Sequence, residues 1–176
     1  MSRENLWAPW RISYVKSVAD QPAGGDNGDG CFMCEACAPD LSAEARERQL
    51  VLYGNEHGVL MLNRYPYTNG HLLIVPPEHV ADMSELSAAR QAGLMGLIDL
   101  GNRLLQNALN PQGMNVGLNM GRCAGAGKPG HVHFHVVPRW HGDVNMMDVV
   151  GEVRVIPQAL HESYRVLAET LSQMNE

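Results

Sequence analysis

The chain has 176 residues, of which 45% are hydrophobic and 18% are charged, and its formal net charge is −6. This length allows one well-buried core but not two ordinary domains, and the composition is typical of a soluble globular protein. The negative charge argues against a protein that coats nucleic acid, although a local group of backbone N–H donors can still hold a phosphate.

The first forty residues predict an N-terminal arm followed by a cysteine-rich loop. Residues 1–20 mix aromatic side chains with charges and contain no apolar run of signal-peptide length, and no later window reaches the length of a membrane span. Glycines and a proline make residues 21–30 a loop by composition, and this loop leads into CFMCEAC at residues 31–37. We therefore expect a cytoplasmic protein whose four cysteines are thiols.

The remaining elements predict an α+β fold. A short polar helix is expected at residues 41–49, and a long helix begins after Ser87 and ends at Asn110, before a proline. Apolar residues recur along the long helix at spacings of three and four. Strands are expected at residues 49–54, 58–65, 71–77, 114–120 and 131–138, and a second helix at about 157–173. This order predicts one antiparallel sheet of about five strands packed against one long helix.

Three of the eight histidines occupy every second position of the apolar run HVHFHVV. In a strand, His131, His133 and His135 would share one face at intervals of about 6.5 Å, and the residues between them would share the other. That spacing suits a ligand lying along the strand, such as a chain of phosphates, or a metal ion. Histidines clustered in this way indicate a functional site more strongly than a half-buried strand.

The loop immediately before these histidines, GRCAGAGKPG at residues 121–130, is rich in glycine. Glycines such as Gly125 and Gly127 let the backbone turn its N–H groups inward, where they can hold a phosphate or an oxyanion. The loop is not a Walker A motif, because no Gly-Lys-Ser/Thr follows. Its position next to the histidines predicts an anion site.

Cys31 and Cys34 form a Cys-x-x-Cys pair. Such a pair can supply half of a tetrahedral zinc site that two histidines complete. A thioredoxin-like redox pair would need a surrounding βαβ pattern, which the sequence does not show. Free thiols remain the alternative to a structural zinc, and Cys37 is an alternative ligand to Cys34.

The histidine run resembles the signature of the histidine triad (HIT) family, His-φ-His-φ-His-φ-φ with φ apolar. LNRYPYTNGHLLIVPPEHV is similar to the family's Asn-containing strand, turn and Gly-His strand. LWAPWRISYV and HVVPRWHGDVNMM resemble the branch that contains the diadenosine tetraphosphate phosphorylases. The resemblance implies a HIT-like fold in a single domain over residues 1–176, with an arm and Cys-rich loop at 1–40, a catalytic core at 49–150 and a C-terminal helix at 151–176.

The resemblance also implies an enzyme that acts on the α-phosphate of dinucleoside polyphosphates. By the family's pattern, His133 attacks phosphorus and forms a nucleotidyl-histidine intermediate, which an unprotonated imidazole can do near neutral pH. His135 would contact the phosphate and help to protonate the leaving group, while His71 and His131 would belong to the same site. The same pattern implies a substrate-binding set: Asn63 at the ribose, Asn119, Gly125 and Gly127 at phosphate oxygens, and Trp140. An aromatic cap on the sheet edge is an equal alternative for the tryptophan.

The chain departs from the commoner family pattern in one place. Many relatives carry a glutamine in the loop before the first histidine, where this chain has AGAGKPG. This departure favours phosphorolysis of diadenosine tetraphosphate to ADP and ATP. The alternatives are hydrolysis of dinucleoside polyphosphates or nucleoside phosphoramidates, and a nucleotide-binding module without turnover. A metal centre formed by the histidine run itself, as in cupin-like barrels, would usually need an added carboxylate that VVPRW lacks.

Some members of the family carry a zinc ion, and their pattern implies Cys31, Cys34, His79 and His131 as its ligands. Such a site would fix the ring of His131 next to the nucleophile. Members are typically homodimers, and part of the long helix is a candidate interface. The expected partners are thus an adenosine polyphosphate substrate and a second copy of the chain, without nucleic acid or membrane.

Overall fold

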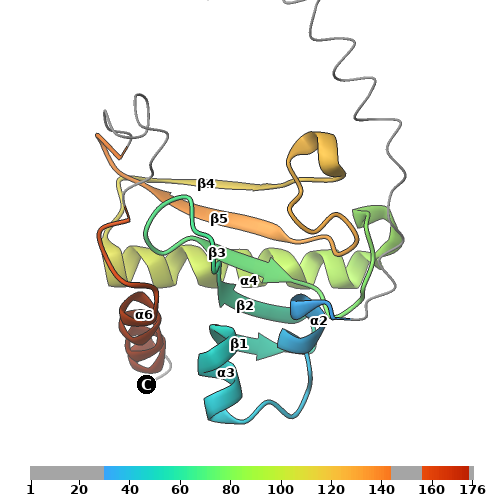
Figure 1. Cartoon of the computed structure of the whole chain (residues 1–176), viewed down its shortest axis with the longest axis horizontal. Helices are drawn as coiled ribbons and strands as arrows, with labels where there is room; N and C mark the ends of the chain where they lie inside the picture. The colour runs from blue at the N-terminus through green and yellow to red at the C-terminus, as the bar shows by residue number, and fades with distance from the viewer. Residues whose placement is uncertain (1–29, 144–155, 175–176) are drawn as a thin grey trace, which may run out of the picture.

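The computed structural model describes residues 30–143 and 156–174, which contain a five-stranded antiparallel sheet (Figure 1). The expected arm at residues 1–20 lies outside these ranges. All five predicted strands are present, and the α+β fold class is confirmed. In the order β1-β2-β3-β5-β4 the strands are β1 (Val51–Asn55), β2 (Gly58–Leu62), β3 (Leu72–Val75), β5 (Phe134–Arg139) and β4 (Gly113–Leu118).

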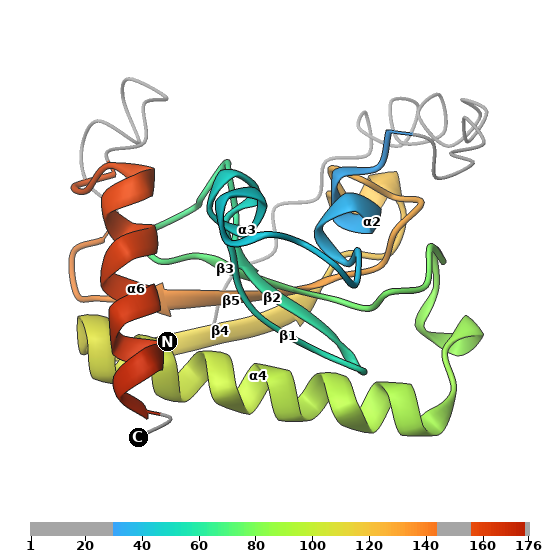
Figure 2. The same ribbon diagram turned by 90° about the horizontal axis from the view of Figure 1, so that it is seen from below.

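Helix α4 (Ala88–Leu109) runs along one face of the sheet, as the sequence predicts (Figure 2). The Ser87 side chain caps its start by accepting a backbone N–H of the first turn, and Asn110 ends it in the left-handed conformation at φ 46°. Gly101 lets the helix approach the strands closely, because a Cβ there would lie only 3.2 Å from Leu60 Cδ1. The C-terminal helix α6 (Leu160–Met174) is also confirmed, and it packs against α4.

Both faces of the central strands are buried, but by different elements. On one face, Leu60 and Leu62 of β2 join α4 and α6 in the main hydrophobic core. On the other face, Val59 and Met61 join a second core that contains the cysteine-rich segment. This double burial explains why β2 is apolar at every position from Val59 to its end instead of alternating.

The apolar residues that alternate with the three histidines, Val132, Phe134 and Val136, lie in the main core. The histidines therefore face away from α4, as predicted. Regular strand pairing begins only at Phe134, however, and not at residue 131 as the sequence predicts. Continuing the register of β3 and β5 places Pro76 opposite Val132, and proline has no N–H to extend the ladder.

The cysteine-rich segment is a helix, not the expected loop. Helix α2 (Phe32–Ala36) buries Met33 and Ala36, one turn apart, against the second core. Helix α3 (Ala43–Gln49) confirms the predicted polar helix and ends at Leu50, which adopts a left-handed φ of 64°. Both helices lie on the face of the sheet opposite α4 (Figure 2).

Two short 3₁₀ turns complete the described elements. Turn η1 (Met83–Glu85) precedes α4, and η2 (Arg122–Ala124) lies in the glycine-rich loop before β5. Within residues 30–143 and 156–174, no helix is both long enough and apolar enough to cross a membrane.

Candidate active site and metal centre

A chain of hydrogen bonds runs from the turn after β2 to His135 and determines where each ring carries its proton. The Tyr67 backbone N–H donates to His71 Nδ1 at 3.1 Å, so His71 carries its proton on Nε2. His71 Nε2 donates in turn to His135 Nδ1 at 2.9 Å. The proton of His135 then lies on Nε2, which is buried and has no hydrogen-bond partner in the described part of the chain. This N–H is therefore a donor available to a substrate.

Asn63 holds His71 in place. Its Nδ2 donates to His71 Nδ1 at 3.3 Å, and its backbone N–H donates to the His71 carbonyl at 2.9 Å. The Asn63 Oδ1 accepts the N–H of Tyr65 at 2.9 Å. The side chain expected at the ribose thus already has partners in the protein, although it remains at the edge of a cavity described below.

His133 has the opposite tautomer to His135. Its Nδ1 donates to the backbone carbonyl of His131 at 2.8 Å, which leaves the lone pair on Nε2. Burial lowers the pKa of His133, although the hydrogen bond to His131 opposes that shift. Burial, together with the neighbouring His133, lowers the pKa of His135 to about 4. The two rings are 4.9 Å apart, so a neutral acceptor nitrogen and a neutral donor N–H lie side by side.

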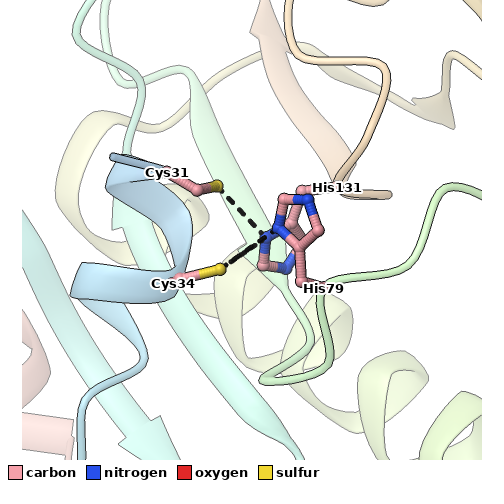
Figure 3. A group of neighbouring side chains, drawn as sticks. All are labelled: Cys31, Cys34, His79 and His131. Atoms are coloured by element: carbon pink, nitrogen blue, oxygen red, sulfur yellow. Dashed lines mark hydrogen bonds between the residues drawn. The ribbon is translucent and has the colours of Figure 1, made fainter. Parts of the chain in front are cut away.

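The first histidine of the run belongs to a second site. Cys31, Cys34, His79 and His131 converge from α2, from the loop after β3 and from the segment before β5 (Figure 3). Their ligand atoms all lie within 4.8 Å of one another. The sulfur-to-Nδ1 distances are 3.4 Å for Cys31–His131, 3.2 Å for Cys34–His79 and 3.5 Å for Cys34–His131.

The chemistry of this Cys2His2 cluster fits a metal ion. In a tetrahedral zinc site the sulfur and nitrogen ligands are about 3.6 Å apart, close to the three distances observed. His131 Nε2 donates to the Pro76 carbonyl at 2.9 Å, so its Nδ1 faces the sulfurs without a proton, as a ligand must. The same residue's carbonyl accepts from His133, which links the cluster directly to the histidine pair.

Cys37 does not take the place of Cys34. Its thiol points at backbone oxygens instead, with Sγ 3.5 Å from the Pro76 carbonyl and 3.9 Å from that of Val75. Burial and the nearby Cys34 raise the pKa of Cys37 to about 12, which favours the thiol over the thiolate that a metal binds. Of the two alternatives that the sequence left open, the geometry favours Cys34.

The glycine-rich loop lies exposed beside the end of β4. Asn119 donates from Nδ2 to the Gly125 carbonyl at 3.4 Å. The Gly125 N–H donates to the backbone carbonyl of Arg122 within the same loop. Gly125 has a left-handed φ of 91°, which a glycine adopts without strain. The N–H of Gly127, by contrast, donates to no acceptor among the described residues. Of the two glycines predicted at the phosphate, Gly127 therefore offers the free donor.

Trp140 lies just beyond β5 and lines a cavity of about 310 Å³ together with Tyr67. The Tyr67 ring is stacked against that of His135 at 5.8 Å, so this cavity adjoins the histidines. Asp143 closes the turn by accepting from Arg139 at 2.9 Å, and this pair lowers the pKa of Asp143 to about 2. The predicted tryptophan is thus close to the histidines, through Tyr67.

A second cavity, of about 400 Å³, was missed by reasoning from the sequence. It lies between α2, the end of α3 and the end of β2. Two of its aromatic side chains are exposed, Phe32 by 45% and Tyr65 by 80%. Its lining consists of Phe32, Glu35, Gln49, Leu50, Met61, Leu62, Asn63, Arg64 and Tyr65. These residues come from three separate segments, so no local pattern indicated that they meet.

Comparison with known proteins is consistent with this arrangement. AP-4-A phosphorylase of Mycobacterium tuberculosis is 36% identical over 167 residues, which cover 94% of this chain and 83% of that protein. Adenosine 5'-monophosphoramidase of Schizosaccharomyces pombe is 38% identical over 109 residues, 62% of this chain and 74% of that protein.

A solved structure and a family model both indicate the histidine triad family. The crystal structure of a Zn-bound histidine triad family protein from Mycobacterium smegmatis matches with a TM-score of 0.65 at 27% identity, and covers 85% of this chain and 98% of that one. The model of the HIT domain matches residues 44–142. With its histidine run on the predicted face of the sheet, the chain belongs to the HIT domain family.

Proposed function

We propose that the chain transfers a nucleotidyl group from a dinucleoside polyphosphate to inorganic phosphate through a covalent intermediate on His133. The observation that carries this proposal is the 2.8 Å hydrogen bond from His133 Nδ1 to the His131 carbonyl, which leaves Nε2 as a free lone pair beside His135. The 36% identity to AP-4-A phosphorylase supports diadenosine tetraphosphate as the substrate, with ADP and ATP as the products.

In the first step, His133 Nε2 attacks the α-phosphorus. A nitrogen–phosphorus bond forms, and the bond from phosphorus to the bridging oxygen breaks with its electron pair on that oxygen, so that ATP departs as an anion. The free Nε2–H of His135 would donate a hydrogen bond to this oxygen as charge develops. Because the pKa of His135 lies at about 4, we assign it this neutral donor role instead of full proton transfer.

In the second step, an oxygen of inorganic phosphate attacks the same phosphorus. The nitrogen–phosphorus bond breaks, its electrons return to His133 Nε2, and ADP is released. The His131 carbonyl stabilises the positive imidazole ring while the intermediate exists, through its bond to Nδ1. Asn119 and the Gly127 N–H are the proposed contacts for the phosphate oxygens.

The nucleoside would occupy the 400 Å³ cavity beside Asn63. Phe32 and Tyr65 offer exposed aromatic surface against which a base can pack. Trp140 and its cavity adjoin the histidines on the other side and are the proposed contact for the second half of the substrate.

Product analysis on diadenosine tetraphosphate, with and without inorganic phosphate, tests the reaction. We expect ADP and ATP only when phosphate is present. His133→Asn should abolish turnover, whereas His161→Asn, a change at an exposed histidine on α6, should leave it unchanged. Formation of AMP and ATP without phosphate would show that the reaction is hydrolysis and not phosphorolysis. Turnover by His133→Asn at the wild-type rate would refute the covalent mechanism.

Two alternative functions predict different experimental results. Nucleoside phosphoramidate hydrolysis is favoured by the 38% identity to the monophosphoramidase, and cleavage of adenosine phosphoramidate faster than the tetraphosphate would establish it. Tight nucleotide binding without any turnover would instead identify a non-catalytic binding module.

We further propose that the Cys2His2 cluster of Cys31, Cys34, His79 and His131 holds zinc. Zinc bound there would cross-link three segments of the chain and supply no chemistry at the phosphate. The protein contributes the rest: the Pro76 carbonyl orients the His131 ring, and the His131 carbonyl orients His133.

We also propose a homodimer. Strand β4 is an edge strand within the described residues, and its Val116 is 46% exposed. An unpaired edge with exposed apolar side chains favours pairing with a second copy. Light scattering should give twice the 19.3 kDa chain mass for the wild type and a single chain mass for Val116→Lys. A monomeric wild type would contradict the proposal.

A further inference from the structure

We propose that Ser163 of the C-terminal helix α6 is a positioning residue for the histidines of the site. It acts through Asn69, which lies in the segment 66–70 between β2 and β3, directly before His71. The expected effect on turnover rests on the proposed function, in which His71 and His135 serve the reaction.

Ser163 is a polar residue at an apolar position of α6. It is 2% exposed and shares one stripe of the helix, at spacings of three and four, with three apolar residues that pack into the main core, Leu160, Leu167 and Leu171. A hydroxyl group buried at such a position is unfavourable unless it makes hydrogen bonds. Packing alone would favour an apolar side chain here, so the hydrogen bonds of Ser163 have to account for the hydroxyl.

Those hydrogen bonds lead to the segment 66–70. The nearest acceptor of the Ser163 hydroxyl is Asn69 Oδ1 at 2.8 Å, ahead of Gln158 Oε1 at 3.0 Å and the Ala159 carbonyl at 3.3 Å. Asn69 Nδ2 donates in turn to Gln158 Oε1 at 3.0 Å. Both ends of the Asn69 amide are therefore held, one by α6 and the other by the chain just before this helix.

The segment connects this anchor to His71. Two residues before Asn69, the Tyr67 backbone N–H donates to His71 Nδ1 at 3.1 Å, and the Tyr67 ring lies 4.6 Å from the His71 ring. A second anchor, the hydrogen bond from Thr68 Oγ1 to the Pro138 carbonyl at 2.9 Å, ties the same segment to β5. The segment is thus fixed between α6 and the sheet, with the Tyr67 N–H directed at His71.

Movement of the segment would reach the proposed donor to the substrate through His71. His71 Nε2 donates to His135 Nδ1 at 2.9 Å, which leaves the His135 proton on Nε2. Hydrogen bonds weaken steeply with misalignment, and a displacement of about 1 Å can slow catalysis about 100-fold. Ser163, Asn69 and Gly70 line a cavity of about 220 Å³, so a segment released from Ser163 has space into which it can move.

The matched variants Ser163→Thr and Ser163→Val test this role, because their side chains have the same shape and only threonine carries the hydroxyl. The cavity beside Ser163 leaves room for the added methyl group in both. With diadenosine tetraphosphate and phosphate, Ser163→Thr should keep the wild-type kcat, whereas Ser163→Val should lower kcat about 10-fold. KM should stay within about 2-fold of the wild type in both, because Ser163 is not part of the nucleoside cavity.

Nuclear magnetic resonance of the ring nitrogens gives a readout that does not depend on turnover. The His71 Nε2 proton should exchange slowly with water in the wild type and in Ser163→Thr, because it is held by His135. In Ser163→Val it should exchange about 10-fold faster, as the segment opens more often. Leu171→Ala is the stability control: Leu171 is buried about two turns further along α6, so alanine there should lower Tm and leave both kcat and this exchange rate unchanged.

The results separate this assignment from the proposed function. A folded Ser163→Val protein with the wild-type kcat and the wild-type exchange rate would show that Ser163 only packs α6, and would overturn the assignment. A fall in kcat as large in Leu171→Ala as in Ser163→Val would also overturn it, because lost stability would then explain both. A wild type without turnover would refute the proposed function, and the exchange rates would still decide the role of Ser163. If thermal melting shows that Ser163→Val is unfolded, Ser163→Ala replaces it, and the same changes are required.

Discussion

Replacement of Gly70 by alanine tests how the turn before His71 is built. Gly70 has a left-handed φ of 78° and directly precedes the histidine that donates to His135. A Cβ at this position would lie 2.5 Å from Leu109 Cδ1 and 3.1 Å from Leu105 Cδ2. Alanine therefore meets two obstacles at once, an unfavourable backbone conformation and two side chains of α4.

The expected loss of folding stability is the sum of these two effects. A left-handed conformation costs a residue with a Cβ about 1 to 2 kcal/mol relative to glycine. Crowding in a packed core costs about 1 to 3 kcal/mol, and Leu105 is fully buried and cannot move aside as freely as Leu109. Gly70→Ala should thus lower the free energy of unfolding by about 2 to 5 kcal/mol. In a chain of this size that corresponds to a fall of roughly 4 to 20 °C in Tm.

Thermal unfolding followed by circular dichroism measures this effect, and Gly96→Ala is the matched control. Gly96 lies inside α4 with no atom within 4 Å of a Cβ and no left-handed φ. Alanine there should stabilise the helix by up to about 1 kcal/mol. The reasoning is wrong if Gly70→Ala melts within about 2 °C of the wild type, or if both variants shift in the same direction. We also expect slower turnover by folded Gly70→Ala, because His71 would be displaced from His135.

Three further predictions concern the cysteines and His135. Cys34→Ser should lose the metal, as measured by elemental analysis, and should bind AMP more weakly. The reason is that the five-residue α2 needs its metal link to hold Phe32 in the nucleoside cavity. Metal retained at one ion per chain would contradict this prediction. The pKa of His135 falls from 6.5 to about 4 on burial, so between these values the unfolded chain binds the extra proton and stability falls as pH falls. His135→Gln should flatten that part of the pH dependence in urea unfolding, and an unchanged slope would refute the assignment. Iodoacetamide at pH 8 should label the exposed Cys123 well before Cys37, whose pKa is about 12, and equal labelling would contradict that order.

Local patterns were sufficient to predict most of the fold. The spacing of apolar residues and the capping Ser87 predicted α4, because a helix must bury one stripe of its surface. The cysteine-rich segment was predicted wrongly as a loop, since a five-residue helix has little local signal and depends on burying Met33 and Ala36 against the sheet. The start of β5 was predicted three residues too early, because the proline that ends pairing, Pro76, follows a different strand, β3.

The sequence by itself determined which side chains can do chemistry here: alternation places the three histidines on one side of a strand, and Cys-x-x-Cys offers two sulfur ligands one helical turn apart. The resemblance to the HIT family already implied separate roles for these histidines, and only the tertiary structure gives the contacts that separate them. His131 turns to Cys31 and Cys34, while His133 lies against His135. Ring tautomers depend on partners such as the Tyr67 N–H and the His131 carbonyl, and the nucleoside cavity joins segments far apart in the chain. Contacts of that kind depend on how the elements pack, and no local pattern of residues encodes them.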